Sequence, residues 1–437
     1  MKRIFIPLLA LLVASGADAA LKIQSWTLDN GARVLFVENH TIPMLDLSVE
    51  FDAGARRDPQ RKSGLAALTN AMLARGVQAV AAEPAQNEAQ ISDAFADTAA
   101  QRGGSAGSER SGITLRTLSA NPERDAAITL VARILAQPSF PEDILARDKA
   151  RTIASLKEEG TKPESIANKA FWRALYGEHP YALQASTTSI DAITRDDLVA
   201  FHRDHYVANR AVIALIGDVT RVQADAIAQQ LTVRLAQSGS ALPALPPVPA
   251  AQASETRIAH PASQAHILIG APALQRGDPD YFTLTVGNYI LGGGGFVSRL
   301  TREVREKRGL TYSVYSYFSP MAQPGPFQIG LQTKKEQTDQ ALQVVRETLA
   351  AYLHDGPTPQ ELQAAKDNLI GGFALRIDNN RKILDNIAAI GYYQLPLDYL
   401  DTWTAQIAKV SAPDVKAAFA RKIATDKLAT VVVGVDR

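Results

Sequence analysis

The chain has 437 residues, more than one ordinary core accommodates, which predicts two domains of roughly 200 residues each. Its hydrophobic share of 46% and charged share of 21% are typical of a soluble globular protein, and they exclude a disordered or membrane-embedded chain. The 46 Lys and Arg nearly cancel the 45 Asp and Glu, which excludes the broad positive field of a general nucleic-acid-binding protein. The lack of cysteine excludes disulfides, thiol nucleophiles and cysteine-ligated zinc.

The first 19 residues have the pattern of a cleavable signal peptide. Lys2 and Arg3 precede an apolar run over residues 4–13, and small residues at 17 and 19 favour cleavage after Ala19. About ten apolar residues are too few to cross a bilayer, which takes roughly 20. No later segment is long and apolar enough either. We therefore expect an exported protein of a bacterial periplasm or the cell exterior, without stable membrane insertion.

Strands and helices alternate along the rest of the chain in two similar runs. In the first, residues 33–37 and 45–51 are predicted strands, followed by helices near 63–74 and 125–135. In the second, a strand at 267–269 precedes helices near 281–291 and 340–353. Between them, residues 236–256 are rich in proline and alanine without helical or strand periodicity, which predicts a semi-extended linker. The expected domains are therefore residues 20–235 and 257–437.

A single offset relates the two halves. Thr194 and Ser411 are 217 positions apart, and Gly217 and Gly434 are also 217 apart. Thr194 and Ser411 each have an aspartate three residues further on, a short-armed capping box at a helix start. The apolar runs that end at the two glycines are predicted buried strands. The sequence predicts a duplicated α+β unit in which each half is an antiparallel sheet covered by helices.

Residues 54–73 resemble the segment that carries the inverted zinc motif H-x-x-E-H in the pitrilysin, or insulinase, peptidase family. Weaker matches follow the family order at 28–31 (LDNG), 179–181 (HPY), 216–218 (IGD) and 294–296 (GGF). The resemblance covers nearly the whole chain after the signal peptide. It implies the family's metallohydrolase fold, with two homologous half-chain domains.

The zinc motif itself is degenerate. In that family two histidines at i and i+4 hold zinc and the glutamate at i+3 activates water. The three positions are occupied here by Ala67, Asn70 and Ala71, and the family's third ligand, a carboxylate, falls at or near Asp148. Alanine has no donor atom, a neutral amide cannot take a proton from water, and one carboxylate holds a transition metal poorly. We therefore expect an alanine-rich amphipathic helix and no metal bound by this chain.

Two other features invite a site assignment. His202 and His205 stand at i and i+3, but no third ligand is evident, so a solvated or hydrogen-bonded pair is the simpler interpretation. A run of glycines suggests a phosphate loop, yet the Lys-Ser/Thr that such a loop requires does not follow. The alternatives for this run are a turn or hinge near the substrate groove, or close backbone packing. The glycines are Gly292, Gly293, Gly294 and Gly295.

The most informative stretch lies in the second half. Residues 300–315 are predicted to form a charged helix that ends at Gly309, followed by a strand from near Thr311. In the pitrilysin family an arginine and a tyrosine seven positions apart lie just before and inside such a strand. The resemblance therefore implies Arg305 and Tyr312 as the pair that binds a peptide carbonyl as its oxygen becomes negative. Composition alone favours the simpler interpretation, an arginine on a solvated helix face and a tyrosine packed on a sheet, and only the family resemblance favours a functional pair.

Family members with two separate subunits divide the zinc motif and the Arg/Tyr pair between them. The resemblance therefore implies a non-catalytic, substrate-binding subunit of a heterodimeric zinc metallopeptidase, inactive alone, whose homologous partner supplies H-x-x-E-H and the zinc. Its substrates would be peptides or unfolded segments. A catalytically inert scaffold or peptide-holding protein of the same fold is the alternative. A free-standing enzyme with a new site has least support, because no nucleophile elbow, phosphate loop or distinctive carboxylate pair is present.

Overall fold

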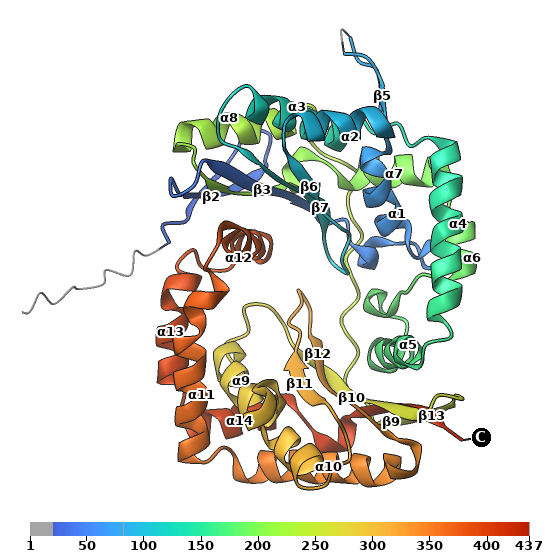
Figure 1. Ribbon diagram of the computed structural model, residues 1–437, viewed down its shortest axis with the longest axis vertical. Coiled ribbons are helices and arrows are strands. Elements are labelled where there is room, and N and C mark those ends of the chain that lie inside the picture. The colour runs from blue at the N-terminus through green and yellow to red at the C-terminus, as the bar shows by residue number, and fades with distance from the viewer. Residues whose placement is uncertain (1–20, 82, 437) are drawn as a thin grey trace, which may run out of the picture.

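The computed structural model describes residues 21–81 and 83–436, and the predicted signal peptide at 1–19 lies outside them. The first half forms a six-stranded sheet in the order β1-β2-β8-β3-β7-β6, and the second a five-stranded sheet in the order β11-β12-β10-β13-β9 (Figure 1). The strands of the first sheet are β1 (Gln24–Thr27), β2 (Arg33–Glu38), β3 (Met44–Phe51), β6 (Gln101–Gly103), β7 (Ser111–Leu118) and β8 (Val212–Gly217). Those of the second are β9 (Ser254–Ala259), β10 (Gln264–Leu274), β11 (Val314–Phe318), β12 (Gly325–Lys334) and β13 (Ala429–Val435). The predicted α+β class with two homologous halves is confirmed.

Each sheet departs from the predicted antiparallel pattern at one strand pair. β2 pairs with β8 in parallel, and β9 pairs with β13 in parallel, while all other pairs within the two sheets are antiparallel. Parallel neighbours need a long crossover connection, and in each half nearly the whole unit lies between these two strands. Short local runs of sequence give no sign of such a pairing.

The offset of 217 residues extends through the observed elements. Helices α7 (Arg195–His205) and α14 (Ala412–Lys422) begin 217 positions apart, and Thr194 and Ser411 both form the predicted capping boxes. Gly217 and Gly434 both adopt positive φ, at 150° and 105°. A Cβ atom at either glycine would lie within 2.4 Å of a backbone carbonyl oxygen on the neighbouring strand. Both halves therefore require glycine at this point for the same steric reason.

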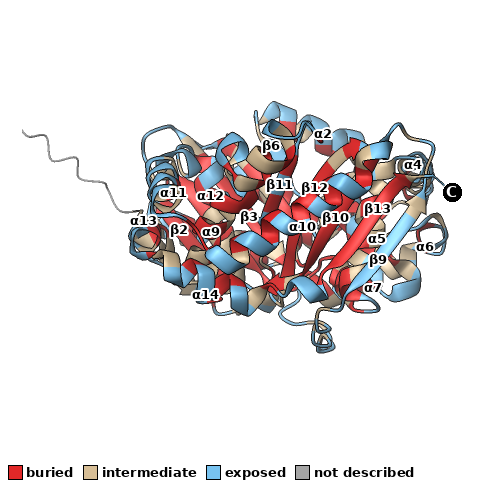
Figure 2. Ribbon diagram, turned by 90° about the horizontal axis from the view of Figure 1, so that it is seen from below, coloured by how far each residue is buried: buried red, intermediate tan, exposed pale blue. Residues whose placement is uncertain are grey.

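The helices cover the outer faces of the two sheets (Figure 1). Helix α3 (Glu123–Ala136) packs against β7 and α8 (Arg221–Thr232) against β2, while α9 (Tyr281–Asn288) and α10 (Thr338–Asp355) pack against β11 and β12. The strands beneath them are buried; in Figure 2 β10 and β13 are red, whereas the edge strand β9 is pale blue. The sides of the molecule carry α1 (Leu65–Met72), α2 (Glu88–Asp97), α4 (Glu142–Glu159), α6 (Thr187–Asp191), α11 (Pro359–Gly371) and α13 (Tyr399–Lys409). The short hairpin β4 (Gly76–Val77) and β5 (Gln86–Asn87) lies apart from both sheets.

The two halves exchange helices across their interface. Helix α5 (Pro163–Tyr176) belongs to the first half but packs on β10 and β13, and α12 (Asn380–Tyr393) belongs to the second half but packs on β2, β3 and β8. The two helices begin 217 positions apart. Phe171 of α5 is fully buried against the second sheet, and Gly391 of α12 lies against Leu35 in the first. Each half therefore completes the core of the other.

The connection between the halves is largely without regular structure. No helix or strand occupies residues 233–253, and β9 begins at Ser254, two residues before the predicted end of the linker at 256. Within residues 21–81 and 83–436, no helix is both long enough and apolar enough to cross a membrane.

Candidate functional site

Helix α1 presents the positions of the degenerate zinc motif in two directions. Ala67 and Ala71 are exposed on one side of the helix, as their spacing of four residues predicts. Asn70 instead is only 9% exposed, and its side-chain amide donates to the Gly112 carbonyl (3.1 Å) and the Tyr206 hydroxyl (3.3 Å). Asn70 therefore points away from the side that carries Ala67 and Ala71, and its amide joins α1 to the core.

Asp148 on α4 is 2% exposed and surrounded by arginines. Arg75 Nε, one turn beyond Ala71, lies 3.2 Å from Asp148 Oδ2, while Arg147 Nε and Arg151 Nη2 lie 3.0 and 3.3 Å from Oδ1. Arg75 and Arg147 also pair with Glu88 on α2. Three cations thus compensate the carboxylate that the family resemblance assigns to zinc.

These side chains do not fit a zinc site. Ala67 and Ala71 offer no donor atoms, and Asp148 is already held by guanidinium groups that a cation would have to displace. In the described part of the chain no three His, Asp or Glu side chains gather in an arrangement that could hold a metal ion. The side chains at these positions therefore support no zinc-dependent catalytic step on this chain.

His202 and His205 are hydrogen-bonded separately. A ring nitrogen of His202 contacts the Leu135 carbonyl at 2.7 Å, and one of His205 contacts the Asp52 carbonyl at 2.9 Å. Burial lowers the pKa of both imidazoles, because the charged form is poorly solvated there. The simpler interpretation, a hydrogen-bonded pair rather than a metal site, agrees with this geometry.

Arg305 and Tyr312 line one pocket of about 320 Å³ beside the end of β12. Arg305 lies in a π-helical turn (Thr301–Glu306), with its guanidinium carbon 4.7 Å from the centre of the Phe296 ring. The predicted strand is present as β11 but begins at Val314, three residues later than Thr311, so Tyr312, which is 85% exposed, lies before the strand and not inside it. The Thr311 hydroxyl instead donates to the Gln332 carbonyl (2.6 Å), and this bond fixes a turn that presents the tyrosine to solvent.

The four glycines precede this turn and lie mostly in tight surroundings. Gly292 and Gly293 belong to a second π-helical turn, and Gly295 adopts a φ of 60°. A Cβ atom would lie 2.6 Å from the Ser316 backbone nitrogen at Gly292 and 2.7 Å from the Tyr289 carbonyl oxygen at Gly294. Close backbone packing therefore explains Gly292 and Gly294, and positive φ explains Gly295. π-helical turns are themselves frequent at functional sites.

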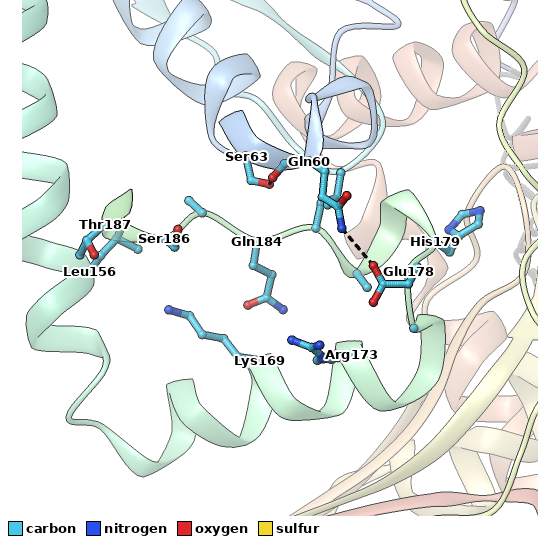
Figure 3. Close-up of a pocket in the computed structure, with 14 residues that line it drawn as sticks. Gln60, Ser63, Leu156, Lys169, Arg173, Glu178, His179, Gln184, Ser186 and Thr187 are labelled. Atoms are coloured by element: carbon cyan, nitrogen blue, oxygen red, sulfur yellow. Dashed lines mark hydrogen bonds between the residues drawn. The ribbon is translucent and has the colours of Figure 1, made fainter. Parts of the chain in front are cut away.

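A polar pocket within the first half is not among the features that the sequence predicts. It has a volume of about 540 Å³ and lies between α5, the turn Gln60–Lys62 and the segment that leads into α6 (Figure 3). Lys169 and Arg173, one turn apart on α5, point into it, and Gln60 donates to Glu178 at 3.0 Å. No motif marks these residues, because they come together only through the packing of α5.

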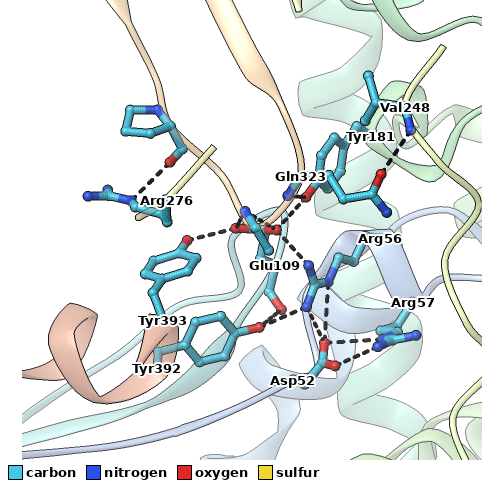
Figure 4. Close-up of polar contacts among 12 residues, drawn as sticks. Asp52, Arg56, Arg57, Glu109, Tyr181, Val248, Arg276, Gln323, Tyr392 and Tyr393 are labelled. Carbon is cyan, nitrogen blue, oxygen red and sulfur yellow. Dashed lines mark hydrogen bonds and ion pairs between the residues drawn. The ribbon is translucent and has the colours of Figure 1, made fainter. Parts of the chain in front are cut away.

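A second missed feature is a buried polar cluster where the halves meet (Figure 4). Glu109, 4% exposed, accepts hydrogen bonds from Arg56 (2.6 Å), Tyr181 (2.5 Å) and Tyr393 (2.7 Å). The backbone N–H of Ala322, in the connection between β11 and β12, donates to both oxygens of Glu109 at 3.1 Å. Burial is the main cause that raises the pKa of Tyr393 to about 12, so its phenol stays protonated and can donate. This cluster joins the two halves at their centre.

The comparisons with known proteins agree with this arrangement. The model of the peptidase M16 inactive domain matches residues 192–369. A solved structure of a peptidase M16 inactive domain from Pseudomonas fluorescens is 40% identical, with a TM-score of 0.90, over 95% of this chain and 99% of that chain. The non-peptidase homolog YmxG of Helicobacter pylori is 28% identical over 401 residues, 87% of each protein. The uncharacterized zinc protease YmxG of Bacillus subtilis is 25% identical over 370 residues, 83% of this chain and 87% of that protein. The chain therefore belongs to the peptidase M16 family, as the resemblance to pitrilysin-type peptidases predicts.

Proposed function

We propose that this protein is the non-catalytic, substrate-binding subunit of a heterodimeric zinc metallopeptidase that acts on peptides or unfolded segments. A homologous partner with an intact H-x-x-E-H motif supplies the zinc. This chain donates Arg305 and Tyr312 to the partner's site. The complex works in the periplasm after export, and the mature chain begins at Ala20, which N-terminal sequencing of the secreted protein tests.

One contrast supports the proposal. The exposed positions of α1 carry methyl groups, whereas Arg305 and Tyr312 both reach the same solvent-open pocket. Within the described residues neither the Arg305 guanidinium nor the Tyr312 hydroxyl has a hydrogen-bond partner, so both donors are available to a ligand. A guanidinium and a phenol together suit a carbonyl oxygen that becomes negative as water adds.

The test is a peptidase assay of the mature chain, of an H-x-x-E-H partner, and of their mixture. We expect hydrolysis of a fluorogenic peptide only, or far faster, in the mixture. R305A and Y312F should each lower the kcat of the mixture by about 10²-fold, the usual effect of removing one oxyanion donor. R308A is the matched control, since Arg308 is an exposed neighbour bound to Glu303 and outside the pocket.

Two results would contradict this function. Hydrolysis by the purified chain alone, abolished by a chelator, would mean that it has its own metal site. Equal activity of the R305A, Y312F and R308A mixtures would mean that the pair is not used in catalysis. Circular dichroism of each variant separates loss of activity from loss of folding.

An inert scaffold or peptide-holding protein of the same fold is the second candidate. It is favoured by the arginines around Asp148, which give the former ligand position a stable arrangement without metal. In that case R305A and Y312F leave the turnover of any complex unchanged, while the chain alone still binds peptide. Measuring peptide affinity beside turnover therefore distinguishes the two functions.

A further inference from the structure

A pocket of about 400 Å³ lies where the two halves and the linker meet, next to the cluster around Glu109. Arg33 and Arg210 reach it from the first half and Arg276 from the second, and Leu242 of the linker borders it. Figure 4 shows Arg276 and Tyr393 on one side of this region and Asp52 and Arg56 on the other. Arg33, Arg210 and Arg276 are all half-buried, so their charges are only partly solvated.

The negative charge in the pocket is already compensated. Its single carboxylate, Asp52, binds Arg56 at 3.0 Å and Arg57 at 2.5 Å. Burial of Asp52 opposes ionisation, but the Arg57 and Arg56 guanidiniums outweigh it and hold its pKa below the usual value. The Tyr392 hydroxyl donates to the Glu109 carbonyl (2.9 Å). These groups leave no charge to balance further arginines.

The side-chain hydrogen bonds of Arg33, Arg210 and Arg276 all go to backbone carbonyl groups, and the guanidinium carbon of Arg276 also lies 5.0 Å from the centre of the Tyr393 ring. Arg33 Nη1 donates to Gly391 (2.5 Å), Arg276 Nε to Pro320 (3.0 Å) and Arg210 Nη2 to Ser240 (2.5 Å). Among the described residues no carboxylate lies within 4 Å of any of the three guanidiniums. These carbonyls fix where the guanidiniums lie but do not neutralise them, so the pocket carries three uncompensated positive charges.

We propose that this pocket binds a multiply charged oxyanion of the phosphate class, such as diphosphate, through Arg33, Arg210 and Arg276. Guanidinium groups present forked donors that match phosphate oxygens, and several of them suit an anion of more than one charge. A single peptide carboxylate would leave most of the positive charge unbalanced. Because both halves supply arginines, the bound anion stabilises the observed arrangement of the halves over any more open one.

The test is isothermal titration of the mature chain with diphosphate at constant ionic strength. R276M and R33M should each weaken binding by about tenfold or more, since each removes a charge-assisted hydrogen bond. The matched control is R195M, because Arg195 is also half-buried and bound only by carbonyls (Phe140 at 3.0 Å, Ser139 at 3.1 Å), away from the pocket. Diphosphate should also slow proteolytic cleavage of the segment 233–253 in the wild type but not in R276M.

Three outcomes would overturn the assignment. The wild type could fail to bind diphosphate at millimolar concentration, or R195M could weaken binding as much as R276M does. A peptide that ends in two glutamates could bind while diphosphate does not, which would make the ligand a peptide carboxylate. Peptidase activity is not part of this test, so the result is independent of the proposed subunit function.

Discussion

Glu109 offers the sharpest test of how the two halves are held together. Its buried carboxylate accepts hydrogen bonds from Arg56 and Tyr181 of the first half and from Tyr393 and the Ala322 backbone of the second. The change E109Q keeps the size of the side chain but removes its charge. It also turns one acceptor oxygen into an NH₂ group, which must then face a donor in a cluster where every neighbour donates.

We expect E109Q to lower the free energy of unfolding by about 3 kcal/mol, because breaking a buried ion pair leaves the other charge poorly compensated. Asp52 remains bound to Arg56 in E109Q, so the Arg56 charge stays partly compensated and the loss of unfolding free energy should not exceed this value. Y393F removes one hydrogen bond and should cost about 1 kcal/mol. Chemical unfolding followed by circular dichroism measures both values, and E83Q, which removes a partly exposed ion pair with Arg234, should lower stability much less than E109Q does. If E109Q were as stable as E83Q, the cluster would not be what joins the halves.

The remaining predictions concern α1 and the partly buried His202. The double variant A67H/A71H restores two imidazoles on the exposed side of α1. Its zinc affinity, measured by calorimetry, should stay weak because Arg75 still holds Asp148. Adding R75A should raise the zinc affinity by about tenfold. Tight stoichiometric zinc in the double variant would show that the arginine does not compete. Burial holds the pKa of His202 below 6.5, so as pH falls through 6.5 the unfolded chain binds a proton that the folded chain excludes, and stability decreases. H202Q should reduce the loss of unfolding free energy between pH 7.5 and 5.5, and an unchanged loss would mean that His202 does not contribute.

Local sequence signals predicted the parts of the fold that depend on nearby residues. Thr194 and Ser411 cap helices as expected, because the side chain and the N–H groups it serves are three residues apart. Gly217 is the last residue of β8 and Gly434 the last but one of β13; both have positive φ, and the neighbouring strand leaves no room for a side chain at either. The single offset between these positions was enough to predict the duplication.

What sequence could not predict depends on partners far along the chain. An apolar stripe on α5 indicates that one face is buried, but not that β10 and β13 of the other half cover it. Glu109 gave no signal, because the tyrosines and the backbone N–H that bind it lie 72 to 284 positions away. Threonine and tyrosine are common in strands, so the sequence places Tyr312 in one. The hydrogen bond from Thr311 to β12 holds a turn there instead.

The exposure of Ala67 and Ala71 explains how this fold persists without metal ligands. Ala67 and Ala71 face solvent, so replacing larger polar side chains there removes no core contact, and alanine is the residue that most favours a helix. Asn70 faces inward, and its amide donates to the Gly112 carbonyl, a bond that an ionised carboxylate could not make. The core of the first half is built from its sheet, its covering helices, the inward face of α1 and α12 of the other half, and none of these contacts involves Ala67 or Ala71. Loss of the zinc motif therefore abolishes metal chemistry on this chain while leaving intact the surface that presents Arg305 and Tyr312.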